Sequence, residues 1–312
     1  MSTSMPMNTA TTITTPNPEA AAGAGGRLPA SAGDALGASK RSVLRASFNR
    51  RGDRTVMEDK YHTAPIKIAK SFPLEDELAV MVMDVSPGML EGDCYELEWT
   101  AGEGSGIYVT NQSFMKVHPC PDGRGAALKQ RFSLAPGAFV QHMPEPVMLY
   151  KDAKFASDTV VHLAPGSAWM QAEVLCPGRT LRGEVFAYRR FDNRLAVYYG
   201  DELIFAQRQR IEPAVQPLSS AGCWDDKTHF GTFYLFSDKI DGSHPAAVRE
   251  ALDALPQTAG REVLYGVTLT HRHGLAVSAA AGAAWPLQQV LEAAWTCARS
   301  AVFGKQPLRF RK

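Results

Sequence analysis

The fold is indicated most directly by Leu78-Ala-Val-Met-Val-Met-Asp-Val85 and by the segment that follows it, Ser86-Pro-Gly-Met-Leu-Glu-Gly-Asp93. The first is a short apolar run, and the second is rich in the residues that form turns. Short apolar or alternating runs that are separated by Gly, Pro, Asp and Asn are typical of β-sheet proteins. We therefore expect a β-strand that ends in a tight turn.

The same alternation of runs and turns continues through most of the chain from Val43 onward. Several runs alternate apolar and polar residues, as half-buried strands do. This predicts a mainly β domain made of many short strands, a pattern shared by sandwiches, barrels and β-solenoids. Besides 78–85, the predicted strands are 106–110, 129–134, 159–163, 169–174, 195–199 and 203–207.

Helical patterns occur only in the last third of the chain. A Ser cap at Ser243 and an early Pro predict a helix near 245–256. A second helix is expected over 286–303, where apolar residues recur on one face, as a helix that packs on a sheet requires. We identify no internal repeat and no linker between domains, so 40–312 is predicted to form a single domain.

Residues 1–39 differ in composition from the rest. They are rich in Ala, Ser, Thr, Gly and Pro and contain no aromatic residue. Such a segment cannot bury enough apolar surface to offset the entropy of ordering it. We expect a disordered extension, with a transit peptide as the alternative.

Charge and cysteine usage narrow the class of protein. The formal net charge is +1, which gives no long-range attraction to nucleic acid or to an anionic membrane. The five cysteines are scattered and form no CxxC pair, as expected for reduced thiols in the cytoplasm. No run is long and apolar enough to span a bilayer. We expect a cytoplasmic protein that binds neither nucleic acid nor membranes.

The usual motifs of enzymes are absent from the sequence. It contains no GxSxG, no GxxxxGK[ST], no HExxH, and no GxGxxG between a strand and a helix. His271 and His273 would share one face of a strand, where two imidazoles could bind a metal. The alternative is that they are ordinary surface histidines. His118-Pro-Cys120 is a weaker metal candidate of the same kind.

Three polar clusters stand between apolar runs and glycine turns. They are Glu91-Gly-Asp93, Thr110-Asn-Gln-Ser-Phe-Met-Lys116 and Gly178-Arg-Thr-Leu-Arg-Gly-Glu184. A carboxylate in such a place can line a polar channel, pair with an Arg, or cap its turn. The residues alone leave these possibilities open.

In this order, the clusters resemble the motifs of the UreD/UreH family of urease accessory proteins. Ser86–Asp93 resembles the glycine-rich turn that ends in Gly-Asp, 110–117 resembles T-x-Q-x-x-x-K, and 178–186 resembles GRxxxGE followed by an aromatic residue. Further similarities are the opening 51–67, the Pro-Glu segment at 143–147 and the Arg-containing ending at 307–311. The resemblance spans about 260 residues.

The resemblance implies a flattened, solenoid-like β-helicoid with a few C-terminal helices. It also implies a maturation factor rather than an enzyme. Such a scaffold docks on apo-urease with a UreF-type protein and, through it, a UreG-type GTPase. Nickel, bound only transiently, would pass through a polar tunnel to the urease active site, and no cofactor would be held tightly.

A conduit needs several weak sites, because three or four His or Cys ligands would retain the ion. Our candidates for the lining are the carboxylates Glu91, Asp93, Glu145 and Glu184. Thr110, Gln112, Lys116 and Arg179 are candidates for supporting polar contacts. No residue is assigned a catalytic role. The alternatives are a β-rich metal-dependent enzyme that uses His271 and His273, and a protein-interaction module without a metal role.

Overall fold

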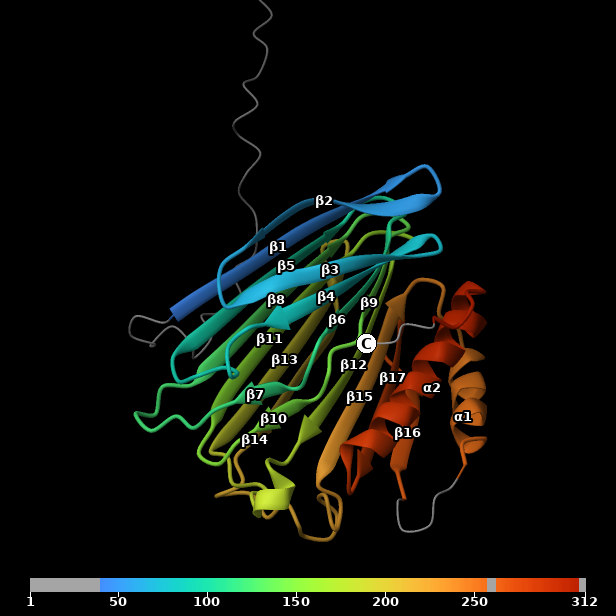
Figure 1. Ribbon diagram of the computed structural model, residues 1–312. Helices are drawn as coiled ribbons and strands as arrows, with labels where there is room; N and C mark the ends of the chain where they lie inside the picture. The colour runs from blue at the N-terminus through green and yellow to red at the C-terminus, as the bar shows by residue number, and fades with distance from the viewer. Residues whose placement is uncertain (1–39, 257–261, 309–312) are drawn as a thin grey trace, which may run out of the picture. The chain divides into compact units, whose positions relative to one another are not determined.

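A computed structural model describes residues 40–256 and 262–308, which form two β-sheets and two α-helices (Figure 1). The first sheet has the strand order β14-β13-β11-β8-β5-β1-β2. Its strands are β1 (Lys40–Arg51), β2 (Arg54–His62), β5 (Asp93–Ala101), β8 (Ala126–Leu134), β11 (Lys154–Leu163), β13 (Arg190–Tyr199) and β14 (Glu202–Ile211).

The second sheet has the order β16-β17-β15-β12-β9-β6-β4-β3, and the short strands β7 and β10 pair beside it. Its strands are β3 (Ile66–Leu74), β4 (Glu77–Asp84), β6 (Gly106–Asn111), β7 (Met115–Val117), β9 (Phe139–His142), β10 (Val147–Leu149), β12 (Ala168–Cys176), β15 (His229–Ser237), β16 (Leu264–Leu269) and β17 (Gly274–Ala281). All seven strands predicted from the sequence are present.

The middle of the chain winds between the two sheets as a flattened solenoid. From β5 to β13 the longer strands alternate between the sheets, and successive strands within each sheet are parallel. Antiparallel strands close both ends of this parallel region. The predicted mainly β, solenoid-like architecture is confirmed.

A repeated turn forms one row of corners of the solenoid. Leu-Ala-Pro-Gly occurs at 134–137 and again at 163–166. Gly137 and Gly166 adopt φ of 68° and 71°, a left-handed conformation that favours glycine. Gly137 N–H donates to Pro165 O at 3.2 Å, so the two turns stack. The prediction of no internal repeat is therefore wrong. The repeated segment is only four residues long at each corner, so it gives the chain no visible long period.

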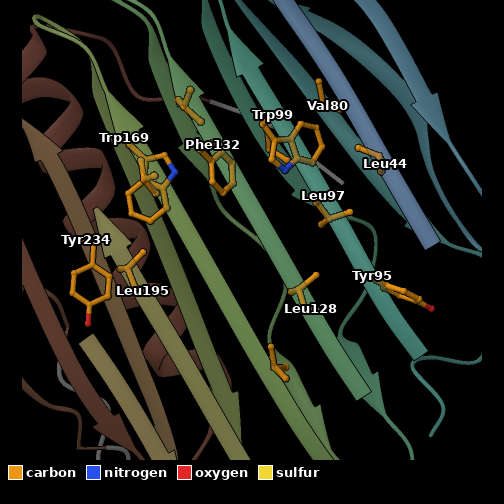
Figure 2. Close-up of a cluster of buried hydrophobic side chains, with 14 of the residues drawn as sticks. Leu44, Val80, Tyr95, Leu97, Trp99, Leu128, Phe132, Trp169, Leu195 and Tyr234 are labelled. Atoms are coloured by element: carbon orange, nitrogen blue, oxygen red, sulfur yellow. The ribbon is translucent and has the colours of Figure 1, made fainter. Parts of the chain in front are cut away.

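The main apolar core lies between the two sheets (Figure 2). Trp99 and Phe132 stack along the first sheet with ring centroids 6.4 Å apart, and Phe132 reaches across to Trp169 at 5.7 Å. Their strands alternate inward apolar and outward polar residues. β12 is buried over most of its length, because the helices cover its other face.

The helices α1 (His244–Asp253) and α2 (Ala284–Phe303) pack on the outer face of the second sheet and form a second core with it (Figure 1). They lie where the sequence predicts helices, near 245–256 and 286–303. The apolar face of α2 is buried, as its spacing indicates; its members include Leu287, Val290, Leu291, Ala294 and Trp295. Residues 1–39, with the predicted extension, and 309–312 lie outside the described residues.

Candidate functional site

A band of polar side chains crosses the interior between the sheets. On the first sheet, Gln130 and Thr159 are register partners on β8 and β11. On the second, His142, Gln171 and Tyr234 are register partners on β9, β12 and β15. All five are buried. Buried polar groups are expensive unless they are hydrogen-bonded, so a band of them inside a sheet protein is a candidate functional site.

Two cavities lie along this polar band. The larger has a volume of ≈ 110 Å³, and Glu145, Gln130 and His142 contribute to its lining. The smaller, of ≈ 10 Å³, is lined almost entirely by polar residues, among them Asn193 and Gln207. Glu173 is half-buried and contributes to the lining of both cavities. We call the polar side chains that line these two cavities the polar path; apolar side chains such as Trp99 and Leu128 complete the lining of the larger cavity.

Hydrogen bonds fix the polar side chains along the path. Asn193 Nδ2 on the first sheet donates to Glu173 Oε2 on the second at 2.9 Å. Tyr234 donates to Gln207 across the same gap. Because the bonds cross between the sheets, they hold the interior at a fixed width at this point.

The histidine of the path is neutral and oriented. His142 Nδ1 lies 2.8 Å from Gln171 Oε1, which can only accept, so Nδ1 carries the hydrogen and Nε2 has the lone pair. Burial lowers the pKa of His142 to about 4. An imidazole that stays neutral at physiological pH keeps its lone pair for a metal ion or a hydrogen-bond donor.

The pKa of the Glu173 carboxyl group is shifted in the opposite direction. Burial raises the pKa of Glu173, partly opposed by the hydrogen bond from Asn193. Burial also raises the pKa of Tyr234 to about 12, so its phenol stays protonated. A carboxyl group that prefers to hold its proton binds a cation only when the proton leaves, which weakens the binding.

The pKa of His142 predicts a loss of stability in acid. Its folded pKa of about 4 lies below the unfolded value of about 6.5, so the unfolded chain binds more protons between these values. The contribution of His142 to the free energy of unfolding is fully present above pH 6.5, and it should fall by roughly 3 kcal/mol as the pH drops to 4. Urea unfolding at stepwise pH would measure the fall.

The matched variant is His142→Gln, which keeps a donor for Gln171 but does not titrate. Buried His229, whose pKa is also lowered to about 4, should make its own contribution in both proteins. We therefore expect a shallower pH dependence in the variant. Equal slopes in the two proteins would contradict the prediction.

The structure brings four of the residues proposed from the sequence to the larger cavity. Glu145, Thr110, Gln112 and Lys116 all contribute to its lining. Thr110 Oγ1 is buried and donates to Met143 O at 2.7 Å, whereas Gln112 and Lys116 are exposed. The backbone N–H of Glu145 donates to Asn111 Oδ1 at 2.6 Å.

Glu91 and Asp93 lie apart from this lining and hold the corners of the solenoid. Glu91 accepts the backbone N–H groups of Asp122 and Arg124 at 3.1 and 2.8 Å, which ties one corner to the next. Asp93 Oδ2 accepts the N–H of Leu90 at 2.7 Å and caps its own turn. The structure thus gives each carboxylate a defined hydrogen-bonding role in a turn.

Arg179 and Glu184 form an ion pair with each other on a surface loop. Arg179 Nε donates to Glu184 Oε2 at 2.8 Å, and Arg179 Nη2 donates to Glu184 Oε1. This pairing lowers the pKa of Glu184. Neither residue lines the two cavities described above.

The prediction that His271 and His273 share one face of a strand is wrong, because both lie in the turn between β16 and β17. His273 has φ of 52°, and its ring packs on Tyr199 with centroids 4.8 Å apart. Its Nε2 accepts from Arg272 Nε at 3.1 Å. Within 40–256 and 262–308, no three His, Cys, Asp or Glu side chains are grouped so as to hold a metal ion.

Sequence reasoning did not identify His142, Gln171 or Glu173. A signal for two of them was present, because Trp169, Gln171 and Glu173 alternate along one predicted strand and therefore face the same side. Polar residues in phase with a buried Trp indicate a polar interior.

In the described part of the chain, neither helix is long and apolar enough to cross a membrane.

Comparisons with known proteins agree with the motifs. A sequence profile of the family described as UreD urease accessory protein matches residues 40–312. The chain is 33% identical over 262 residues to the urease accessory protein UreD of Acetivibrio thermocellus, covering 82% of this chain and 96% of that protein.

Two further relatives are more distant. The urease accessory protein UreH of Helicobacter hepaticus is 28% identical over 203 residues, which cover 65% of this chain and 80% of the relative. The urease accessory protein UreD of Bacillus sp. strain TB-90 is 26% identical over 271 residues, with 86% and 98% covered. The matches extend over nearly the full length of two of these three proteins.

Proposed function

Because this chain belongs to the UreD family of urease accessory proteins, and so has a role in urease maturation, we propose that it conducts nickel to apo-urease. The observation that carries the proposal is the polar path inside the solenoid, where Glu173 lines both cavities. Nickel is the cargo of this path and not a resident cofactor. The chain itself has no catalytic role.

The proposed assembly has three partners. The chain docks on apo-urease and binds a UreF-type accessory protein, which in turn holds a UreG-type GTPase that supplies the metal. All of these steps take place in the cytoplasm. The exposed Lys116 and the carboxyl group of Glu145 lie at the lining of the larger cavity, where the ion would enter or leave the path.

The chemistry of the path suits a cargo that must move on. Ni²⁺ binds imidazole well, and His142 and Glu173 offer one nitrogen and one carboxylate among amide and hydroxyl groups. Each contact is weak, and proton binding to Glu173 competes with the metal. An ion therefore meets several shallow sites in sequence, as conduction requires.

The proposal predicts that Glu173→Gln slows nickel transfer without breaking the assembly. Gln has nearly the same shape and can still accept from Asn193, but it cannot carry a negative charge. We expect nickel incorporation into urease to fall on the order of tenfold, the effect typical of removing a group that supports a metal. Nickel bound per urease and urease activity measure the result, with complex formation followed in parallel.

The matched control is Glu98→Gln, the same chemical change on the outward face of β5, where Glu98 pairs with exposed Arg45. This variant should activate urease as well as the wild type does. Full activation of urease by the Glu173→Gln variant would refute the proposed nickel path through Glu173. Loss of the complex in that variant would instead show that the carboxyl group serves the fold.

A further inference from the structure

One ring nitrogen of His142 faces open space inside the protein. Nδ1 is committed to Gln171, and no described residue forms a hydrogen bond with Nε2. Within 40–256 and 262–308, three buried side-chain atoms have neither open space nor a hydrogen-bond partner beside them: Trp99 Nε1, Trp169 Nε1 and Tyr188 Oη. His142 Nε2 is not one of these atoms, so it touches open space, and the larger cavity is the space that His142 lines.

Gln171 holds the imidazole ring in this orientation. His142 of β9 and Gln171 of β12 are register partners, so both side chains stand on the inner face of the second sheet. They are only 7% and 5% exposed. An acceptor on the other ring nitrogen fixes the tautomer and the orientation of an imidazole that binds a metal. The Gln171 carbonyl oxygen is such an acceptor for His142.

The imidazole of His142 differs chemically from the other groups that line the polar path. Among the described residues that line the two cavities, His142 is the only histidine, and none is a cysteine. The carboxylates of Asp84, Glu145 and Glu173 offer oxygen, as do several amides and hydroxyls. Mg²⁺ and Ca²⁺ take oxygen ligands, whereas imidazole suits Ni²⁺. A lining of oxygen alone would not favour nickel over these two ions.

The larger cavity has room for an ion that keeps part of its water. Its volume of ≈ 110 Å³ is several times the roughly 10–15 Å³ that one water needs. An ion in this cavity can therefore bind Nε2 of His142 and hold several waters. Because no group of three His, Cys, Asp or Glu within the described ranges could hold a metal, one nitrogen gives a preference without tight retention.

We propose that His142 is the specificity-determining residue of the polar path, which favours Ni²⁺ over Mg²⁺ and Ca²⁺, and that Gln171 is its positioning residue. The inference rests on the proposed function, which makes Ni²⁺ the cargo. It does not extend to Cu²⁺, which ranks above Ni²⁺ for nitrogen ligands and should compete for the same atom. The choice among transition metals therefore has to be made before the ion enters the path.

The first test follows the histidine ring signals of the full-length chain by NMR, with ¹⁵N-labelled histidine, as Ni²⁺ alone is added. Ni²⁺ is paramagnetic and broadens the signals of an imidazole that it binds. His142→Gln, or His142→Asn if the first variant does not fold, identifies the His142 signals by their loss. These signals should broaden at lower Ni²⁺ than those of His162, which packs on Tyr198 outside both cavities. Mg²⁺ alone should change neither.

The second test measures bound Ni²⁺ by equilibrium dialysis of full-length proteins. Gln171→Met should weaken nickel binding on the order of tenfold, and His142→Gln by at least as much. His162→Gln, the matched control, should bind as the wild type does. A large excess of Mg²⁺ or Ca²⁺ should leave nickel on the wild type but remove what His142→Gln still holds. In Gln171→Met, the ¹⁵N shifts of His142 should also show a mixture of tautomers, which a loss of stability alone would not cause.

The outcomes separate this inference from the function on which it rests. Broadening of exposed histidines alone, with His142 unchanged at every Ni²⁺ concentration, would overturn the inference and leave the path to its own test at Glu173. Equal removal of nickel by Mg²⁺ from the wild type and from His142→Gln would overturn it as well. A single unchanged tautomer in Gln171→Met would overturn the role of Gln171. A wild-type chain that binds Ni²⁺ at His142 but delivers none to apo-urease would overturn the proposed function instead.

Discussion

A strain that lacks this chain should still produce urease protein, but the enzyme should contain almost no nickel and have almost no activity. The reason is that the proposed path delivers the ion to apo-urease inside protein, whereas diffusion from solvent must compete with every other metal and ligand in the cell. Nickel per purified urease, urease activity and urease protein level would all be measured in the same cells.

Two complementation experiments serve as controls for the deletion strain. Re-expression of the wild-type chain should restore nickel content, and the Glu98→Gln variant should restore it equally. Unchanged urease protein level is expected, since the proposed role begins only after apo-urease has been synthesised. Normal nickel content and activity in the deletion strain would refute the role in nickel delivery.

Seven strands of the fold could be predicted because their sequences carry a local alternation or a short apolar run. Lys154–Leu163 alternates buried and less buried residues, and its second half, 159–163, is the part predicted from the sequence. The winding of the chain between two sheets is different. It depends on which strands pair, and the only local trace of it is the Leu-Ala-Pro-Gly turn that recurs at two corners.

The site was harder to predict, because the motifs and the polar path belong to different parts of the solenoid. Glu91, Asp93 and Glu184 stand out in the sequence since they sit beside glycine, and the structure uses them in corners and loops. His142 and Glu173 stand inside ordinary strands. That both line the larger cavity follows from the winding that places β9 beside β12, which no short motif encodes.

The corner residues form recognisable motifs and the polar residues inside the strands do not, and this difference has a physical reason. A corner needs a left-handed backbone and a carboxylate to satisfy free N–H groups, so it fixes several residues within a short span. A polar interior needs only that a polar residue replaces an apolar one at an inward position. The first requirement leaves a recognisable motif, and the second leaves a single substitution in an otherwise normal strand.

The largest effect on folding is expected at a buried ion pair beneath α2. Arg299 Nη1 lies 3.1 Å from both carboxylate oxygens of Glu77, and the two side chains are 3% and 1% exposed. Gln141 donates to the same carboxylate at 2.7 Å and accepts from Trp295 Nε1 at 2.9 Å. This network fastens the end of α2 to the outer face of the second sheet.

Glu77→Gln should therefore lower the free energy of unfolding by about 3–5 kcal/mol, because it leaves the Arg299 guanidinium buried without a carboxylate. Arg299→Met should cost less, since Lys305 Nζ also lies 2.9 Å from Glu77 Oε1 and still pairs with it. Urea unfolding of the purified chain, followed by circular dichroism, would measure both variants.

The double variant Glu77→Gln/Arg299→Met tests the cause of the loss. If the buried unpaired charge is responsible, removal of both charges should recover much of the stability lost in Glu77→Gln, so the two substitutions are strongly non-additive. Glu98→Gln, which breaks an exposed pair, should change the free energy of unfolding by less than about 1 kcal/mol. Simple additivity at Glu77 and Arg299 would contradict this explanation, because it would show that the two side chains do not stabilise each other.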